Sequence, residues 1–239
     1  EGELASKLVG RGRMEEPERI VDILASALNE VGDLRGRTVL ITAGPTYEKI
    51  DPVRFIGNYS SGKMGFALAE ACARRGAEVR LVAGPVALGT THPHITRTDV
   101  ESADEMYDAA TALFPGCDIA ILAAAVADYR PHTPAEVKIK REETGHLTLP
   151  LVSNRDIAAA LGRRKRPDQR LVGFALETND ERAHAEEKLR RKRLDLIVLN
   201  SLQDAGAGFG VDTNKITVID ALGNARDFPL KSKTELADD

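Results

Sequence analysis

Apolar positions along the chain form short continuous runs that alternate with stretches of helical spacing. Runs rich in β-branched residues are typical of strands buried on both faces, and they predict strands at residues 38–42, 79–83, 118–123, 171–175 and 194–200. Apolar residues that recur three or four positions apart predict helices at residues 64–75, 102–114, 154–164 and 180–193. Because strands and helices alternate, we predict an α/β fold with a doubly wound, mostly parallel, Rossmann-like sheet.

The C-terminal part of the chain departs from this alternation. Residues 215–220 and 226–230 flank a turn at residues 221–224, and they predict a β-hairpin on the sheet edge or in a small flap. Residues 231–236 then have the pattern of a capped helix start, and the chain stops at Asp239. We therefore expect the C-terminus to be truncated relative to a longer parent protein.

The N-terminal part also has its own pattern. Residues 1–14 are polar and contain glycine, as in a flexible linker, and the chain starts with Glu1 in place of methionine. Apolar positions within residues 17–32 have the spacing of an amphipathic helix. We expect a linker and amphipathic helix over residues 1–35 and a single nucleotide-binding domain over residues 36–239.

Charge and composition exclude several classes of partner. The net charge is −4, and acidic and basic residues are mixed along the chain, so no overall basic field is present to hold a nucleic-acid backbone. No apolar run approaches the length that spans a bilayer, and no segment has the order of a signal peptide. We expect a cytoplasmic protein without nucleic-acid or membrane partners. Cys72 and Cys117 lack the spacing of a zinc site and are expected to be reduced core residues.

Two glycine-rich turns precede the first predicted crossover helix. Gly44 follows the first strand, and residues 57–65 lead directly into the helix. Free backbone N–H groups and the positive end of the helix dipole favour an anion there, and the hydroxyls of Ser60 and Ser61 add donors. The pattern therefore indicates a phosphate site. The alternative is a capped helix whose glycines serve only tight turns and close packing.

Two common nucleotide sites fit these turns poorly. Residues 57–63 match the spacing of a P-loop, but Met64 stands where a P-loop needs a hydroxyl to hold Mg²⁺. A dinucleotide site needs an acidic residue near the end of the second strand, where residues 82–85 are Val-Ala-Gly-Pro. An NAD(P)-dependent Rossmann oxidoreductase is therefore the disfavoured alternative.

Two later loops have a functional and a structural interpretation each. Small residues at 123–127 let a base or ribose approach the backbone, and Asp128 is placed to bind a hydroxyl or a metal ion; a packed strand end with a solvated aspartate fits equally well. Lys138 and Lys140 alternate with apolar residues, so they face one way in an extended segment. One interpretation is that these lysines bind a triphosphate. The other is an exposed edge strand whose lysines prevent pairing with another chain, and the residues alone favour this second interpretation.

The remaining candidates lie on predicted strand ends and helices. Asn154 opens a helix and is its expected N-cap. Phe174, at a strand end, is placed either against a base or in the core. Lys188 and Lys192 are four apart in a charged helix, and a solvated helix face explains them adequately.

Taken in order, these segments resemble the phosphopantothenate–cysteine ligases, a family that in bacteria usually follows a flavin-containing decarboxylase in one polypeptide. The resemblance runs from about residue 37 to residue 236. It rests on residues 42–46, 51–54, 58–65, 124–129, 138–140, 173–174, 177–178 and Asn200. Each motif is weak alone, but the ordered set is highly specific.

The resemblance implies a reaction in two steps. The carboxylate of 4'-phosphopantothenate attacks the α-phosphate of CTP and releases pyrophosphate, and the amine of L-cysteine then attacks the acyl-cytidylate and releases CMP. Asn58 matches the family's essential asparagine, which would stabilise charge during the attack by the amine. Lys138 matches the lysine of a mobile loop that closes over the nucleotide and excludes water. Family habit in bacteria, rather than any residue pattern, favours CTP over ATP.

By the same resemblance, the nucleotide contacts several loops. Its phosphates are expected at the glycine- and serine-rich turns, at Gly44, Ser60, Ser61, Gly62, Lys63, Met64 and Gly65. Its other contacts are expected at Leu122, Ala123, Ala124, Asp128, Lys138, Arg155, Asp156, Ile157, Ala158, Phe174, Lys188 and Lys192. Mg²⁺ is expected to bridge the phosphates, with Asp128 helping to position it. Many bacterial members have proline where this chain has Arg155, so we expect altered base contacts there.

The resemblance also implies partners. The family forms homodimers, and residues 51–59 are the candidate interface. A fused upstream flavoprotein decarboxylase domain, which would hold FMN, is expected in the parent protein. The alternative from outside the enzymes is a non-catalytic nucleotide-binding or dimerisation module, and the presence of Asn58 and Lys138 speaks against it.

Overall fold

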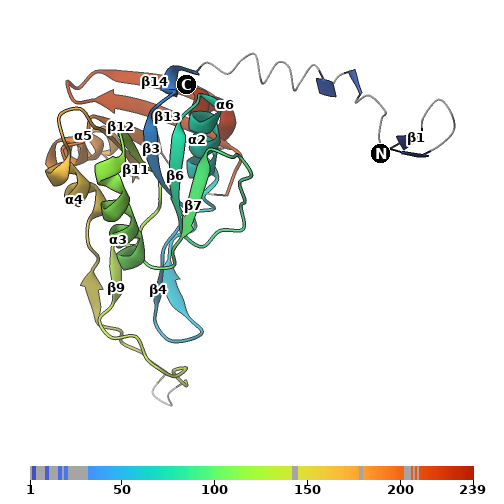
Figure 1. The fold of residues 1–239 in the computed structure, drawn as a ribbon. Helices are drawn as coiled ribbons and strands as arrows, with labels where there is room; N and C mark the ends of the chain where they lie inside the picture. Colours follow the sequence, from blue (N-terminus) through green and yellow to red (C-terminus); the bar gives the residue numbers. More distant parts are fainter. Residues whose placement is uncertain are drawn as a thin grey trace.

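The structure, a computed structural model, describes residues 2–3, 9–10, 16–17, 19–20, 32–141, 145–177, 180–201, 206, 208 and 210–239. Its centre is an eight-stranded sheet with the strand order β14-β13-β12-β11-β8-β3-β6-β7 (Figure 1). The strands are β3 (Thr38–Ala43), β6 (Glu78–Ala83), β7 (Ile95–Asp99), β8 (Ile119–Leu122), β11 (Arg170–Glu177), β12 (Leu196–Ser201), β13 (Thr213–Asp220) and β14 (Ala225–Ser232). All pairs are parallel except those of β13 with β12 and with β14. The predicted fold class and edge hairpin are therefore confirmed.

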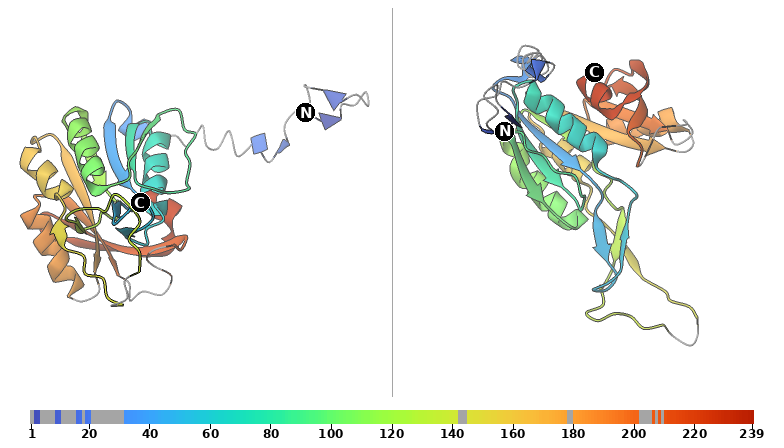
Figure 2. Two further views of the ribbon diagram at one scale, coloured as in Figure 1. Left: turned by 90° about the horizontal axis from the view of Figure 1, so that it is seen from below. Right: turned by 90° about the vertical axis from the view of Figure 1, so that its right-hand side faces the viewer.

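Helices cover both faces of this sheet (Figure 2). Side chains of α3 (Ala103–Leu113), α4 (Ile157–Arg164) and α5 (Glu181–Arg191) are buried in one core cluster, which lies on one face. Those of α2 (Lys63–Arg74) and α6 (Lys233–Asp238) are buried on the other face. Two short 3-10 turns, η1 (Gly32–Leu34) and η2 (Phe114–Gly116), complete these layers. None of the described helices has the length and apolar character needed to cross a membrane.

Short hairpins accompany the main sheet. They pair β1 (Gly2–Glu3) with β2 (Val9–Gly10), β4 (Tyr47–Lys49) with β5 (Phe55–Gly57), and β9 (Tyr129–Pro131) with β10 (Leu151–Ser153). The second and third hairpins project beyond the carboxyl edge of the parallel strands (Figure 1). The β4–β5 turn lies beside the segment that follows β9, because the N–H of Ala135 donates to the carbonyl oxygen of Ile50 at 2.9 Å.

Two local predictions are wrong. No strand forms in the described residues 132–141, since the backbone of Ile139 bonds to the side chains of Asp51 and Arg54 in place of a neighbouring strand. The N-cap of α4 is Asp156, not Asn154, because the carboxylate of Asp156 accepts the N–H of Ala159 at 2.9 Å.

Other predictions about the ends and the cysteines have mixed outcomes. Cys72 and Cys117 are buried and unpaired, as expected. The expected C-terminal helix forms as α6, with Ser232 and Glu235 in a capping box. Most of the predicted helix over residues 17–32, and most of the predicted linker, lie outside the described residues.

Candidate functional site

The strand order reverses between β3 and β8, because the chain passes from β3 outward to β6 and β7 before it returns to β8 on the other side. In open α/β sheets, ligands bind beyond the carboxyl ends of strands at such a point. A cavity of about 730 Å³ lies there. The expected nucleotide residues that line it are Ser60, Ser61, Gly62, Lys63, Met64, Gly65, Leu122, Ala123, Ala124, Asp128, Arg155, Asp156, Ile157, Ala158, Phe174, Lys188 and Lys192.

The first wall is the start of α2. Gly62 is the N-cap residue with φ 78°, a left-handed conformation, and no side chain caps the helix. The first N–H groups of an α-helix have no partner within the helix, so those of α2 are available to an anion in the cavity. Gly65 permits this position, because a Cβ atom there would lie 2.5 Å from the Cβ of Ala43 on β3.

The second wall is the loop that follows β8. Its backbone is fixed by two buried threonines, since Thr42 Oγ1 accepts the N–H of Ala124 at 3.3 Å and Thr46 Oγ1 accepts the N–H of Ala127 at 3.0 Å. Asn58 does not line the cavity itself, but its Nδ2 donates to the carbonyl oxygen of Ala125, which does, at 2.9 Å. The structure thus joins Asn58 to the alanine-rich loop.

The loop after β3 supports the second wall. The carbonyl oxygen of Gly44 accepts the N–H of Ala125 at 2.9 Å, so Gly44 borders the loop rather than the cavity. Because Gly44 does not line the cavity, a phosphate would contact it only if the ligand reached behind the residues that line the cavity.

The third wall carries two lysines, each paired with an acid: Glu177, which is half-buried, and Asp156, which is exposed. Lys188 Nζ lies 2.6 Å from Glu177 Oε1, and Lys192 Nζ lies 3.1 Å from Asp156 Oδ2. Burial raises the pKa of the Asp156 carboxyl, but the N–H of Ala159 and the ammonium of Lys192 lower it by more, so this pKa lies below its usual range. Both lysines therefore border the cavity as ion pairs, and the half-buried ring of Phe174 lines the same cavity.

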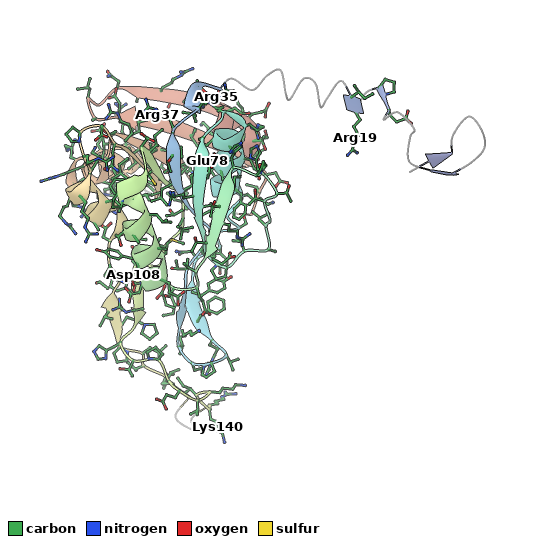
Figure 3. The ribbon with its side chains drawn as sticks, in the orientation of Figure 1. Arg19, Arg35, Arg37, Glu78, Asp108 and Lys140 are labelled. Carbon is green, nitrogen blue, oxygen red and sulfur yellow. The ribbon has the colours of Figure 1, made fainter. Side chains whose placement is uncertain are left out.

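The guanidinium of Arg155 is held against α3. It donates to Asp104 Oδ1 at 2.7 Å and to Asp108 Oδ1 at 2.8 Å, and it lies 4.0 Å from the centre of the Tyr107 ring. These hydrogen bonds to Asp108 and Asp104 raise the pKa of Arg155. Asp108, labelled in Figure 3, lies on α3. Because this charge is already neutralised, Arg155 offers the cavity its backbone and the stem of its side chain.

Lys138 lies apart from the cavity. It belongs to the segment between β9 and β10, which extends far from the sheet with Lys140 near its tip (Figure 3). The segment is attached to the β4–β5 turn, because the guanidinium of Arg54 donates to the carbonyl oxygen of Ile139 at 2.7 Å. The structure therefore does not bring Lys138 together with the other expected residues.

Several cavity residues were not among those expected from the sequence. Asn214 and Lys233 come from β13 and from the start of α6, and both line the cavity. Asn200 also lines it, and the resemblance had included this residue only as a motif position. No local motif marks Asn214 or Lys233, because only the antiparallel return of β13 and β14 brings them to this place.

Comparisons with known proteins show which family the chain belongs to. Residues 34–239 match the family model of the DNA/pantothenate metabolism flavoprotein C-terminal domain. The chain is 46% identical over 239 residues to the coenzyme A biosynthesis bifunctional protein CoaBC of Bacillus subtilis, with 99% of this chain and 58% of that protein covered. It is 56% identical to a protein named cysteine/cysteine sulfinic acid decarboxylase from an unknown prokaryotic organism, with 100% of this chain and 67% of that protein covered.

Solved structures share the fold. A crystal structure of the C-terminal domain of CoaBC has a TM-score of 0.71 and 41% identity, and the match covers 85% of this chain and 91% of that one. A Cab2 variant in complex with phosphopantothenate-cysteine has a TM-score of 0.66 and 20% identity, over 93% of this chain and 92% of that one, which shows a shared fold alone. The chain spans little more than half of the CoaBC protein of B. subtilis. The chain belongs to the phosphopantothenate–cysteine ligase family, the C-terminal domain of the CoaBC proteins, as the resemblance of its motifs indicated.

Proposed function

We propose that this chain joins 4'-phosphopantothenate to L-cysteine, using CTP through an acyl-cytidylate and releasing pyrophosphate and CMP. Family membership supports a role in coenzyme A biosynthesis. The structural observation that carries the proposal is the cavity at the strand-order reversal, where the helix start of α2, the alanine-rich loop and the Phe174 wall meet.

The three walls suit the three parts of a nucleotide. The start of α2 offers backbone N–H groups and the ammonium of Lys63 to the phosphates. The small side chains of the loop after β8 leave room for a ribose near the backbone. The ring of Phe174 offers an apolar face to the base, and Lys188 and Lys192 line the same cavity.

Asn58 is the proposed catalytic residue for attack by the cysteine amine. An amide nitrogen carries two hydrogens, and the bond to the carbonyl oxygen of Ala125 uses one and fixes the orientation of the side chain. The second hydrogen can donate to the acyl carbonyl oxygen as negative charge develops on it. Lys138 would act by movement of the segment between β9 and β10 toward the bound nucleotide, which would keep water from the mixed anhydride.

Magnesium would neutralise charge on the phosphates as pyrophosphate leaves. In the described part of the chain, no group of three or more His, Cys, Asp or Glu side chains is placed to hold a metal by itself. Asp128 lies exposed on the cavity wall, which fits a Mg²⁺ that takes most of its ligands from phosphate oxygens and water.

The proposed setting is a cytoplasmic homodimer, fused in its parent protein to an upstream flavoprotein decarboxylase that holds FMN. The chain's coverage of 58% of B. subtilis CoaBC supports such a parent. The apolar side chains of the β4–β5 hairpin support residues 51–59 as the subunit interface.

The test is pyrophosphate release by the purified chain with Mg²⁺, 4'-phosphopantothenate and either CTP or ATP, with and without L-cysteine. We expect release to require CTP and 4'-phosphopantothenate, and CMP to appear when cysteine is added. Asn58→Ala should lower the rate of CMP release with cysteine about 100-fold or more, because it removes a donor to the oxyanion that develops as the amine attacks. Lys138→Ala should also lower it, whereas Asn224→Ala in the distant β13–β14 turn should not.

Two other outcomes would redirect the assignment. Folded protein that binds nucleotide but releases no pyrophosphate would favour a non-catalytic binding module. Carbon dioxide release from L-cysteine or cysteine sulfinate would instead favour the activity in the name of the 56% identical relative.

A further inference from the structure

A fourth lysine of the cavity wall, Lys233, is buried. Its exposure is 7%, and its ammonium donates to the carbonyl oxygens of Gly208, at 3.0 Å, and Val211. Both acceptors are uncharged. Within the described ranges no carboxylate lies within ion-pair distance of this ammonium, which is an unusual situation for a buried lysine.

Lys233 also lies close to a second positive charge. Lys63 bonds to the same short segment, because its ammonium donates to the carbonyl oxygen of Gly210 at 3.1 Å and to Asp212 Oδ1 at 2.6 Å. Burial and the nearby charge of Lys63 lower the pKa of Lys233, and Asp212 offsets this only in part. Asp212 is 86% exposed, so solvent weakens the field of this one carboxylate. This end of the cavity therefore has an excess of positive charge.

An independent observation concerns Asn214 on the neighbouring strand β13. Its Oδ1 atom has no hydrogen-bond partner in the described part of the chain, although the residue is only 1% exposed and lines the same cavity. Buried side-chain polar atoms nearly always have a partner. Because Oδ1 is an acceptor, its partner is expected to be a donor, such as a ligand hydroxyl or a water, at the same end of the cavity as the two lysines.

We propose that Lys233 is a second phosphate-binding lysine, which acts with Lys63 on the terminal phosphates of the bound nucleotide and on the pyrophosphate that leaves. The inference rests on the proposed nucleotide-dependent function of this cavity. Phosphate oxygens would replace the neutral carbonyl oxygens of Gly208 and Val211, because hydrogen bonds between charged groups are stronger than those to a carbonyl. Asn214 Oδ1, which is an acceptor, would receive a hydrogen bond from a ligand hydroxyl or from a water bound to the phosphates.

The test compares CTP with CMP, because only CTP carries the terminal phosphates. Both are titrated calorimetrically with Mg²⁺ against the wild type, Lys233→Met and Lys231→Met. Lys231 is the matched control, since it lies two residues away, pairs with Asp239 at 2.7 Å and does not line the cavity. We expect Lys233→Met to weaken CTP binding about tenfold or more and to leave CMP binding unchanged. Lys231→Met should change neither affinity.

Thermal unfolding without ligand separates binding from folding. Methionine has a similar volume and no buried charge, so Lys233→Met should unfold at the same temperature as the wild type or higher. Unchanged CTP affinity in Lys233→Met overturns the proposal. An equal loss of CTP and CMP affinity with a lower unfolding temperature also overturns it, because the lysine would then serve the fold.

A third titration, with inorganic pyrophosphate, keeps this result separate from the ligase assignment. If the chain shows no turnover but the wild type binds pyrophosphate and Lys233→Met does not, the phosphate-binding role stands and only the ligase activity fails. If the wild type binds neither CTP nor pyrophosphate, the role of Lys233 is overturned as well.

Discussion

Gly65 shows how one missing side chain positions the candidate site. A Cβ atom at this position would lie 2.5 Å from the Cβ and 3.0 Å from the Cα of Ala43, so Gly65→Ala must push the start of α2 away from β3. Overpacking of this kind costs about 1–3 kcal/mol, and the higher helix propensity of alanine offsets up to about 1 kcal/mol. We expect a lower free energy of unfolding in urea and weaker CTP binding, because the N–H groups of α2 move.

The matched control for this change is Gly89→Ala. A Cβ atom at Gly89 meets nothing within 4 Å, and Gly89 has no left-handed φ angle, so stability and CTP affinity should stay near the wild type. If Gly65→Ala also behaves like the wild type, the contact between α2 and β3 does not position the phosphate site.

At the scale of elements, one buried carboxylate joins the two projecting hairpins. Asp51 accepts the N–H groups of Val53 and Arg54 and that of Ile139, and it pairs with the guanidinium of Arg54. This guanidinium, together with the three N–H groups, holds the pKa of Asp51 well below its usual range. A depressed pKa in the folded state contributes stability above the unfolded-state pKa of about 3.9, and the contribution is lost as the pH falls through the folded-state value.

Asp51→Asn should therefore lower the unfolding temperature at pH 7, because asparagine cannot form the ion pair. The difference from the wild type should shrink as the pH falls below about 3.9. Thermal unfolding at a series of pH values measures both effects. Asp227→Asn, a change of an exposed carboxylate on β14, is the control and should show a smaller difference at pH 7. A difference for Asp51→Asn that does not depend on pH would contradict the role of its charge.

The parallel strands that the sequence predicts well lie inside the sheet, between two neighbouring strands. β3, β6, β8, β11 and β12 stand out as apolar runs, whereas β7, at the sheet edge, is Ile-Thr-Arg-Thr-Asp and has no such signal. Strands of three residues, such as β4 and β9, are too short for periodicity to appear. The alternation around Lys138 suggested a strand, but side chains of the neighbouring hairpin bind that backbone instead.

Local patterns likewise predict only part of the candidate site. Its loops follow predicted parallel strands, so their meeting at one edge could be expected from the order of elements. The contribution of Asn214 and Lys233 depends on the antiparallel return of β13 and β14, and the sequence contains no pattern that fixes this return against α2. Residues that reach a site through tertiary packing alone therefore need the structure.

At the scale of the whole molecule, the projecting hairpins present apolar side chains to solvent. Val53 is 60% exposed and Tyr59 is 93% exposed on the β4–β5 side, while Tyr129 and Val137 are exposed on the β9–β10 side. The two hairpins lie side by side beyond the edge of the sheet (Figure 1). Exposed large apolar residues on neighbouring hairpins are typical of a protein–protein interface, and they support the proposed homodimer through residues 51–59.

Val53→Asp should convert the proposed dimer to a monomer, because the charge would be buried without a partner when two copies meet. Val53 packs little within its own subunit, so the unfolding temperature extrapolated to low protein concentration should change little. Light scattering coupled to size-exclusion chromatography measures the mass of each species. Leu222→Asp is the matched control, since Leu222 is 88% exposed on the β13–β14 turn and its change should leave the dimer intact. A Val53→Asp protein that remains dimeric would move the interface away from the β4–β5 hairpin, and loss of the dimer in both variants would show that added charge alone disrupts it.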